Sequence, residues 1–102
     1  MNNSIGRKVY IVNESSHDFT KAKKFGQLIF CTIGRMNRFS TNDMVRKFQD
    51  AMRNSNKEDY VLLCSLNVMN AIACSVFAHK HGTLNLLLYK DGEYVERNHK
   101  LD

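Results

Sequence analysis

Side chains able to bind an anion or move a proton gather directly after three apolar segments of the chain. These apolar segments are residues 9–12, 28–31 and 60–64. The polar side chains that follow them form the candidate ligand-binding set: Asn13, Ser15, Ser16, His17, Arg35, Asn37, Arg38, Ser65, Asn67 and Asn70. If the three segments are parallel strands, their carboxyl ends share one edge of a sheet, where open α/β sheets bind ligands. The sequence therefore predicts a binding site at that edge.

Arg35 and Arg38 are the best candidates for binding an anion. Both lie in a loop between an apolar segment and a helical pattern, and a guanidinium binds phosphate through two parallel hydrogen bonds. His17 could contact the same phosphate or act as a general acid or base near neutral pH. Structural roles stay open as well. His17 also suits the exposed start of a helix, Asn67 suits a helix cap, and Asn70 needs hydrogen bonds from a ligand, a neighbour or water.

Motifs for catalysis and for metal binding are weak. The sequence contains no Gly-x-Gly-x-x-Gly, no P-loop and no Gly-x-Ser-x-Gly. Ser65 with His17 as its base is conceivable across adjacent strand ends, so catalysis stays open while a binding role is favoured. His79 and His81 stand at a helix end without a third ligand, so we expect no metal and no cofactor.

The elements that must position these residues follow the order β-α-β-α-β-α-β-β. Continuous apolar and β-branched runs predict strands at residues 8–12, 27–32, 60–64, 84–89 and 93–97. The pair Asp91-Gly92 suits a two-residue type I′ turn, so the last two strands should form an antiparallel hairpin.

Three helical patterns separate the strands. The first is a short helix capped by Ser16 and stopped by Gly26, and the second opens with a capping box from Ser40 to Asp43. The third covers residues 67–81 and ends at a glycine. Two apolar stripes should be buried, and they comprise Phe19, Ala22 and Phe25 in the first helix and Met44, Phe48, Ala51 and Met52 in the second.

Right-handed crossovers turn this element order into a small three-layer α/β/α sandwich with a mostly parallel sheet. We predict the strand order 2-1-3-4, with the fifth strand antiparallel at the edge. The chain has 102 residues and 43% hydrophobic content, which suits one domain over residues 1–102. Residues 1–7 and 98–102 are expected to be flexible tails.

Composition bounds the setting of the protein. No apolar run reaches the roughly twenty residues of a membrane span, and the amino-terminal residues lack a signal-peptide pattern, so a cytoplasmic protein is expected. Cys31, Cys64 and Cys74 are odd in number and lie in apolar surroundings, so we expect reduced core thiols. The net charge of +5 arises within residues 1–55, where ten Lys and Arg face four Asp and Glu, and this favours an anionic partner.

The third helical pattern leaves little polar surface. A chain this short cannot easily cover such a helix by itself, so a homodimer or a larger homo-oligomer is expected.

Several segments of the chain together carry a family resemblance. They are YVLLCSLNVMNAIAC at residues 60–74, residues 77–82 and 84–88, and VYIVN and SHDF at residues 9–13 and 16–19. Through these segments, most of the chain resembles small accessory proteins of tailed bacteriophages. The resemblance brings no catalytic residue. It implies a protein that acts on host machinery or host defence in the cytoplasm of a bacterial cell.

Four functions remain open on these grounds. The favoured one is a binder that sequesters a small phosphorylated or nucleotide-derived ligand, as an anti-defence sponge would. The second is a protein-binding inhibitor of a host enzyme. A nucleic-acid-binding protein is less favoured, because stripes of Lys and Arg interleaved with aromatic residues are missing. A small nucleotide hydrolase completes the set.

Overall fold

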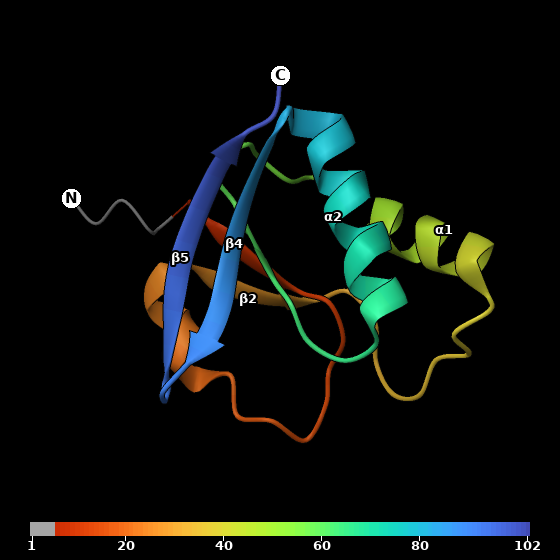
Figure 1. Ribbon diagram of the computed structural model, residues 1–102, viewed down its shortest axis with the longest axis horizontal. Coiled ribbons are helices and arrows are strands. Elements are labelled where there is room, and N and C mark those ends of the chain that lie inside the picture. The colour runs from red at the N-terminus through yellow and green to blue at the C-terminus, as the bar shows by residue number, and fades with distance from the viewer. Residues whose placement is uncertain (1–5) are drawn as a thin grey trace.

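The computed structural model describes residues 6–102 of the chain. In order, its elements are β1 (Lys8–Ile11), the 3-10 helix η1 (Thr20–Phe25), β2 (Gln27–Phe30), α1 (Thr41–Ala51), β3 (Tyr60–Leu62), α2 (Asn67–His81), β4 (Thr83–Lys90) and β5 (Glu93–Lys100) (Figure 1). The strands form one sheet in the order β2-β1-β3-β4-β5. All neighbours are parallel except β4 and β5, which are antiparallel. The predicted α/β class and strand order are confirmed.

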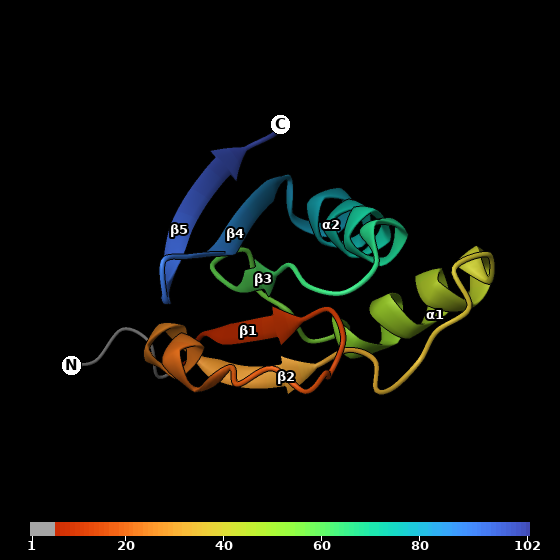
Figure 2. The ribbon, with the colours of Figure 1, turned by 60° about the horizontal axis from the view of Figure 1, so that its bottom comes forward.

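The two faces of the sheet carry separate hydrophobic clusters. Because side chains alternate along a strand, Tyr10 of β1 joins α1 and α2 on one face, while Val9 and Ile11 join η1 on the other. Figure 2 shows α1 and α2 together on one side of the strands and η1 well away from them. One face is therefore covered by two full helices and the other by a single short one.

Helix α1 and its C-cap residue Met52 bury three of the four residues of the predicted stripe, whereas Ala51 is only half-buried. Met44, Phe48 and Met52 are fully buried at a spacing of four residues. The predicted capping box is wrong, because the side chain of Ser40 makes no capping bond. Ser40 has ψ of 58° rather than the extended conformation of an N-cap, so its hydroxyl is not aimed at the first-turn N–H groups.

The segment after β1 differs most from the prediction. Ser16 caps no helix, and η1 starts only at Thr20, where the carboxylate of Asp18 accepts the backbone N–H at 2.9 Å. An isolated bridge between Glu14 and Ile33 continues the strand pairing just past β1, and residues 15–19 that follow are neither strand nor helix. Gly26 stops η1 as predicted, and its N–H donates to the carbonyl of Lys23.

Helix α2 has the predicted bounds. Gly82 ends it in the left-handed conformation with φ of 69°, and its N–H donates to the carbonyl of Ala78 at 2.8 Å. The expectation that Asn67 caps this helix is wrong. Leu66 occupies the N-cap position and Asn67 is the first helical residue, because Leu66 has the extended backbone of a cap.

The hairpin of β4 and β5 is longer than predicted. Asp91 and Gly92 both have positive φ, at 52° and 83°, as a type I′ turn requires. The ladder continues until Thr83 pairs with Lys100, so residues 98–100 belong to β5 and not to a tail. The other predicted tail, residues 1–7, lies mostly outside the described residues. Arg7 is held, since its carbonyl accepts the N–H of Gln27.

Strands β1, β2 and β3 are each one or two residues shorter than predicted at their carboxyl ends. The loops after these strands therefore begin before the apolar residues end, with Val12, Cys31 and Leu63 already outside the strands. Within residues 6–102, no helix combines the length and the apolar character needed to cross a membrane.

Candidate functional site

The carboxyl edge of the sheet is held together by the side chain of Asn13. Its Nδ2 donates to the carbonyl of Gly34 at 3.0 Å and to Oγ of Ser65 at 3.3 Å. Its Oδ1 accepts the hydroxyl of Thr32 at 2.9 Å. One buried amide thus connects the segments that follow β1, β2 and β3, so Asn13 uses its hydrogen bonds within the protein and not on a ligand.

Asn70 has a structural partner as well. Its Oδ1 accepts the backbone N–H of Cys64 at 3.1 Å, which joins the first turn of α2 to the end of β3. A polar residue in an apolar helix requires such a bond. The sequence left a ligand, a neighbouring residue or water as the partner of Asn70, and in the structure the partner is a neighbouring residue.

The short loop before α1 presents Arg35 and Arg38 at the surface. Both side chains are exposed, and neither forms an ion pair in the described part of the chain. Oδ1 of Asn37 accepts the backbone N–H of Phe39 at 2.9 Å and so shapes the turn between Arg38 and Phe39. Asn37 positions its neighbours through this bond.

The segment after β1 presents the remaining candidates. Oγ of Ser15 accepts the backbone N–H of His17 at 3.3 Å, a local turn of the kind that serine often makes. Ser16 and His17 are exposed.

Two cavities open at this edge, and Ser65 lines both. The first, which we name the cationic cavity, has a volume of about 650 Å³ and is lined by Arg38, Phe39, Thr41, Ser65, Leu66, Asn67 and Val68. The second, the aromatic cavity, has a volume of about 410 Å³ and is lined by His17, Asp18, Phe19, Leu62, Leu63, Cys64, Ser65, Tyr89 and Tyr94. Of the predicted set, Arg38, Ser65 and Asn67 line the cationic cavity, and His17 and Ser65 line the aromatic cavity. The other six predicted residues line neither of these two cavities.

Ser65 stands at the turn from β3 into α2 with φ of 69°, which is the left-handed region. A residue other than glycine is strained there, and such strain is found at ligand sites and turns. Its hydroxyl contacts the amide of Asn13 and, at 4.0 Å, the sulfur of Met69. These contacts contain no base, so the arrangement does not form a nucleophile and base pair.

The three cysteines are free. Burial raises the pKa of the Cys31 thiol to about 12, and the neighbouring Cys64 adds to the shift. Burial also raises the pKa of Cys64 and of Cys74. The thiols stay protonated at neutral pH and are poor nucleophiles. Residues 6–102 hold no cluster of His, Cys, Asp and Glu suited to a metal ion.

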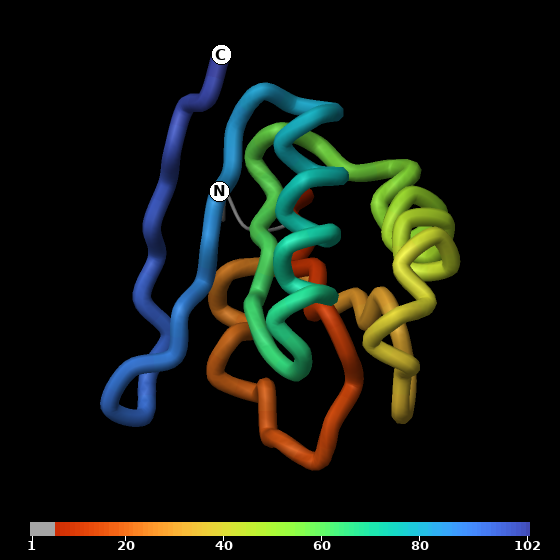
Figure 3. The backbone as a smooth tube through the Cα atoms, turned by 45° about the vertical axis from the view of Figure 1, so that its right-hand side comes forward, coloured from red at the N-terminus to blue at the C-terminus, as the bar shows by residue number. Residues whose placement is uncertain are grey.

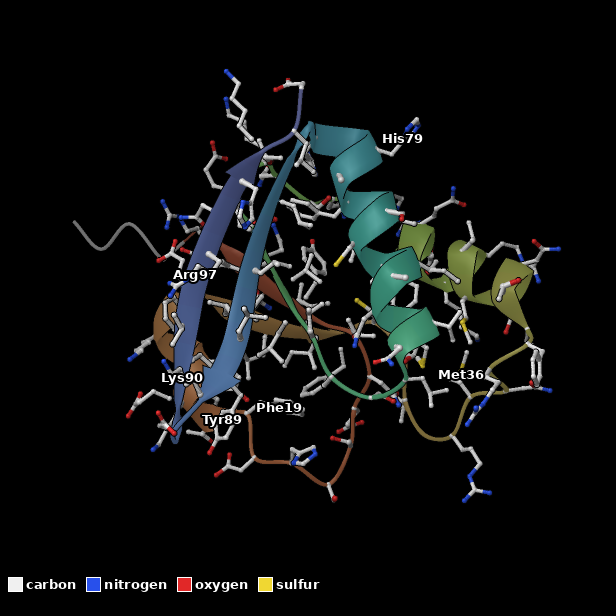
Figure 4. The ribbon with its side chains drawn as sticks, in the orientation of Figure 1. Phe19, Met36, His79, Tyr89, Lys90 and Arg97 are labelled. Carbon is white, nitrogen blue, oxygen red and sulfur yellow. The ribbon has the colours of Figure 1, made fainter. Side chains whose placement is uncertain are left out.

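Two exposed aromatic residues at this edge were not among the residues predicted from the sequence. Phe39 is 83% exposed at the cationic cavity and Tyr89 is 67% exposed at the aromatic cavity. Figure 4 shows Phe19 and Tyr89 next to each other below the end of β4. A signal for Tyr89 existed, because β4 is parallel to β3 and its carboxyl end must reach the same edge.

A third hollow lies away from the edge, between α1 and α2, which run side by side in Figure 3. This apolar groove has a volume of about 780 Å³ and is lined by Val45, Gln49, Met52, Arg53, Ala71, Ile72, Ser75, Val76, His79 and Lys80. Nζ of Lys80 closes one end by donating to the carbonyls of Met52 and Arg53 at the end of α1.

Comparisons with known proteins give one match. Neither curated proteins nor solved structures yield a similar chain. A family model described as Phage Pam3 gp32-like protein matches residues 7–101. This match includes every strand and helix and both cavities of the carboxyl edge, and it confirms the resemblance to bacteriophage proteins. The chain therefore belongs to the phage Pam3 gp32-like family.

Proposed function

We propose that this phage protein binds and sequesters a small phosphorylated ligand at the carboxyl edge of its sheet. The observation that carries the proposal is the cationic cavity, where Arg38 faces a hollow beside the first turn of α2. In the host cytoplasm, removal of a nucleotide-derived defence signal is the biological role that suits such a binder.

The electrostatics of the cavity support an anionic ligand. Leu66, at the N-cap of α2, offers no side-chain hydrogen bond to the first-turn N–H groups. These groups and the positive end of the helix dipole favour negative charge. Arg38 adds a full positive charge, and Arg35 stands in the same loop. A phosphate here would gain charge-assisted hydrogen bonds from a side chain and from the backbone.

Binding without turnover suits the chemistry of the edge. The hydroxyl of Ser65 is held by an amide and not by a base. The thiol of Cys64, at the floor of the aromatic cavity, has a raised pKa. No group there is set up to attack a phosphoryl or acyl centre.

Calorimetric titration tests the proposal. Mono-, di- and cyclic nucleotides and inorganic phosphate are titrated into the wild type, Arg38→Ala and Arg35→Ala. We expect Arg38→Ala to weaken phosphorylated ligands about ten- to a hundredfold, the loss of one charge-assisted contact. Arg35→Ala should have a smaller effect, because Arg38 lines the cavity. Thermal melts check that folding is preserved.

The matched control is Arg46→Ala, an exposed arginine on α1 that pairs with Asp43. It removes the same charge away from the edge and should leave affinity unchanged. Equal weakening in all three variants would indicate a general charge effect. Full affinity in both Arg38→Ala and Arg35→Ala, or no binding of any phosphorylated ligand, contradicts the proposal.

A second candidate function is inhibition of a host enzyme by direct binding. The groove between α1 and α2 favours it, since a helix of a partner can lay its apolar face into such a hollow. Ala71 and Ser75 are exposed, small and one turn apart, and they allow close approach. Ala71→Arg should abolish a complex with a host protein and leave nucleotide titrations unchanged. A complex that survives this substitution argues against the groove.

A further inference from the structure

We infer that the aromatic cavity receives a planar heterocyclic ring, so that the ligand is a nucleotide whose base and phosphate lie on opposite sides of Ser65. This inference rests on the proposed function, because it assigns the phosphate to the cationic cavity. It adds a second contact region and names the ligand class.

The walls of the aromatic cavity are built from two pairs of rings. His17 and Phe19 meet edge to face with centroids 6.2 Å apart, and Tyr89 and Tyr94 do so at 5.3 Å. The first pair comes from the segment after β1 and the second from the hairpin of β4 and β5. Phe19 and Tyr94 are nearly buried, at 6% and 8%, and they fix the walls in place. Tyr89 is 67% exposed and free to lie over an incoming ring.

Stacking on aromatic side chains is how proteins hold nucleobases without reading a particular sequence. The volume of about 410 Å³ lies within the usual range of small-ligand sites. Leu62, Leu63 and Cys64 supply an apolar floor. A neutral flat ring therefore suits this cavity better than an anion does.

The opposite charges at the two cavities determine which end of the ligand each cavity binds. Asp18 lines the aromatic cavity, and its hydrogen bonds with Thr20 lower the pKa of the carboxyl, which is ionised at neutral pH. A phosphate is repelled there and attracted by Arg38 in the cationic cavity. The carboxylate can instead accept hydrogen bonds from an exocyclic amino group. Ser65 lines both cavities, so they adjoin at this residue, and a ligand that spans Ser65 would contact both.

Ligand truncation combined with two variants tests this arrangement. The four nucleoside 5′-monophosphates, the matching nucleosides and ribose 5-phosphate are titrated into the wild type, Tyr89→Ala and Arg38→Ala. In the wild type, at least one nucleotide should bind about tenfold or more tighter than ribose 5-phosphate. Tyr89→Ala should remove most of that difference and leave ribose 5-phosphate unchanged. Arg38→Ala should weaken both.

Tyr89→Phe and Leu88→Ala are the controls. The first keeps the ring and should retain affinity, and the second removes a neighbouring exposed apolar side chain outside the cavity. If every nucleotide binds only as well as ribose 5-phosphate, or if Tyr89→Ala binds nucleotides like the wild type, the inference is overturned and the phosphate site stands. If nucleosides bind as tightly as nucleotides and ribose 5-phosphate does not bind, the proposed function fails and the ring site stands. No binding of any of these ligands overturns both.

Discussion

The two edges of the sheet treat charge in opposite ways. At the amino edge, charged side chains form hydrogen bonds within the protein. Asp59 is fully buried, and its carboxylate accepts the backbone N–H of Lys8 at 3.0 Å and of Asn56 at 2.8 Å. The hydroxyl of Tyr60 accepts from Arg7 at 3.0 Å and donates to a carboxylate of β5 at 2.8 Å.

At the carboxyl edge the buried connections are neutral. Asn13 and Asn70 join the strand ends through amide groups. The charges of Arg35 and Arg38 stay at the surface without ion pairs in residues 6–102. Charge at the amino edge is thus hydrogen-bonded within the fold, whereas Arg35 and Arg38 at the carboxyl edge are exposed.

The strongest test of this contrast is Asp59→Ala. The substitution leaves two backbone N–H groups without their acceptor at a buried position, and we expect a loss of about 3 kcal/mol in the free energy of unfolding. Urea denaturation measures it. Asp50→Ala, which removes an exposed carboxylate of α1, should cost less than about 0.5 kcal/mol. Similar losses of unfolding free energy in the two variants would mean that the carboxylate of Asp59 does not stabilise the fold.

Asn13→Ala tests the uncharged hydrogen bonds that join the strand ends at the carboxyl edge. It removes hydrogen bonds to three segments, and we expect a loss of about 2 kcal/mol. Asn13→Asp should cost at least as much, because an oxygen would then face the carbonyl of Gly34. Asn37→Ala, at an exposed turn, serves as the control in the same urea series. If Asn13→Ala has the same free energy of unfolding as the wild type, the hydrogen bonds of Asn13 do not stabilise the fold, and Asn13 is again a candidate ligand contact.

The turn at Ser65 allows a finer test. Ser65→Gly and Ser65→Ala both remove the hydroxyl, but only glycine adopts φ of 69° without strain. We expect the glycine variant to be more stable than the alanine variant by about 1 kcal/mol. Equal thermal unfolding midpoints for the two would show that the turn relaxes when the side chain changes.

The smallest expected effect concerns pH at the amino edge. His81 bonds with Oγ of Ser55 at 2.7 Å, and burial, helped by the nearby Lys80, lowers the pKa of the imidazole. The unfolded chain then binds a proton more readily than the folded one. Stability should be full above the ordinary histidine pKa of about 6.5 and should fall as the pH drops below it.

Unfolding in urea at pH 7.5 and at pH 5.5 measures this dependence, and His81→Gln should reduce it. His79→Gln, in the same last turn of α2 and exposed, is the control. A pH dependence that is unchanged in His81→Gln would assign it to other groups.

Much of the fold follows from patterns within short segments. Continuous apolar runs and right-handed crossovers predict the strand order, and Asp91-Gly92 predicts the hairpin. Helix caps were predicted less well. Ser40 occupies the N-cap position of α1 but makes no side-chain capping bond, Asn67 lies one residue inside α2, and Ser16 lies four residues before η1.

The candidate residues gather at the carboxyl edge of the sheet, as the strand order predicts, but their arrangement there was not predicted. Asn13 bonds with Gly34 and Ser65, which are 21 and 52 residues away in sequence, and no local pattern reports such contacts. His17 and Arg38 were expected in one pocket, yet they line different cavities that share Ser65. Tyr89 was missed because only three strand ends were considered.

The expected homodimer stays a prediction, and the groove between α1 and α2 is the surface that it would use. Light scattering at micromolar concentration measures the oligomeric state. Ala71→Arg should convert a dimer formed there into a monomer.

The long outer strand β5 limits how such copies can associate. It pairs with β4 along one side only, and an unpaired strand edge is a template on which a second chain can extend the sheet. Charged or titratable residues occupy much of its length, namely Glu93, Glu96, Arg97, His99 and Lys100. Pairing of a second strand on this edge would remove water from these side chains, and charged residues on an outer strand disfavour such edge-to-edge pairing.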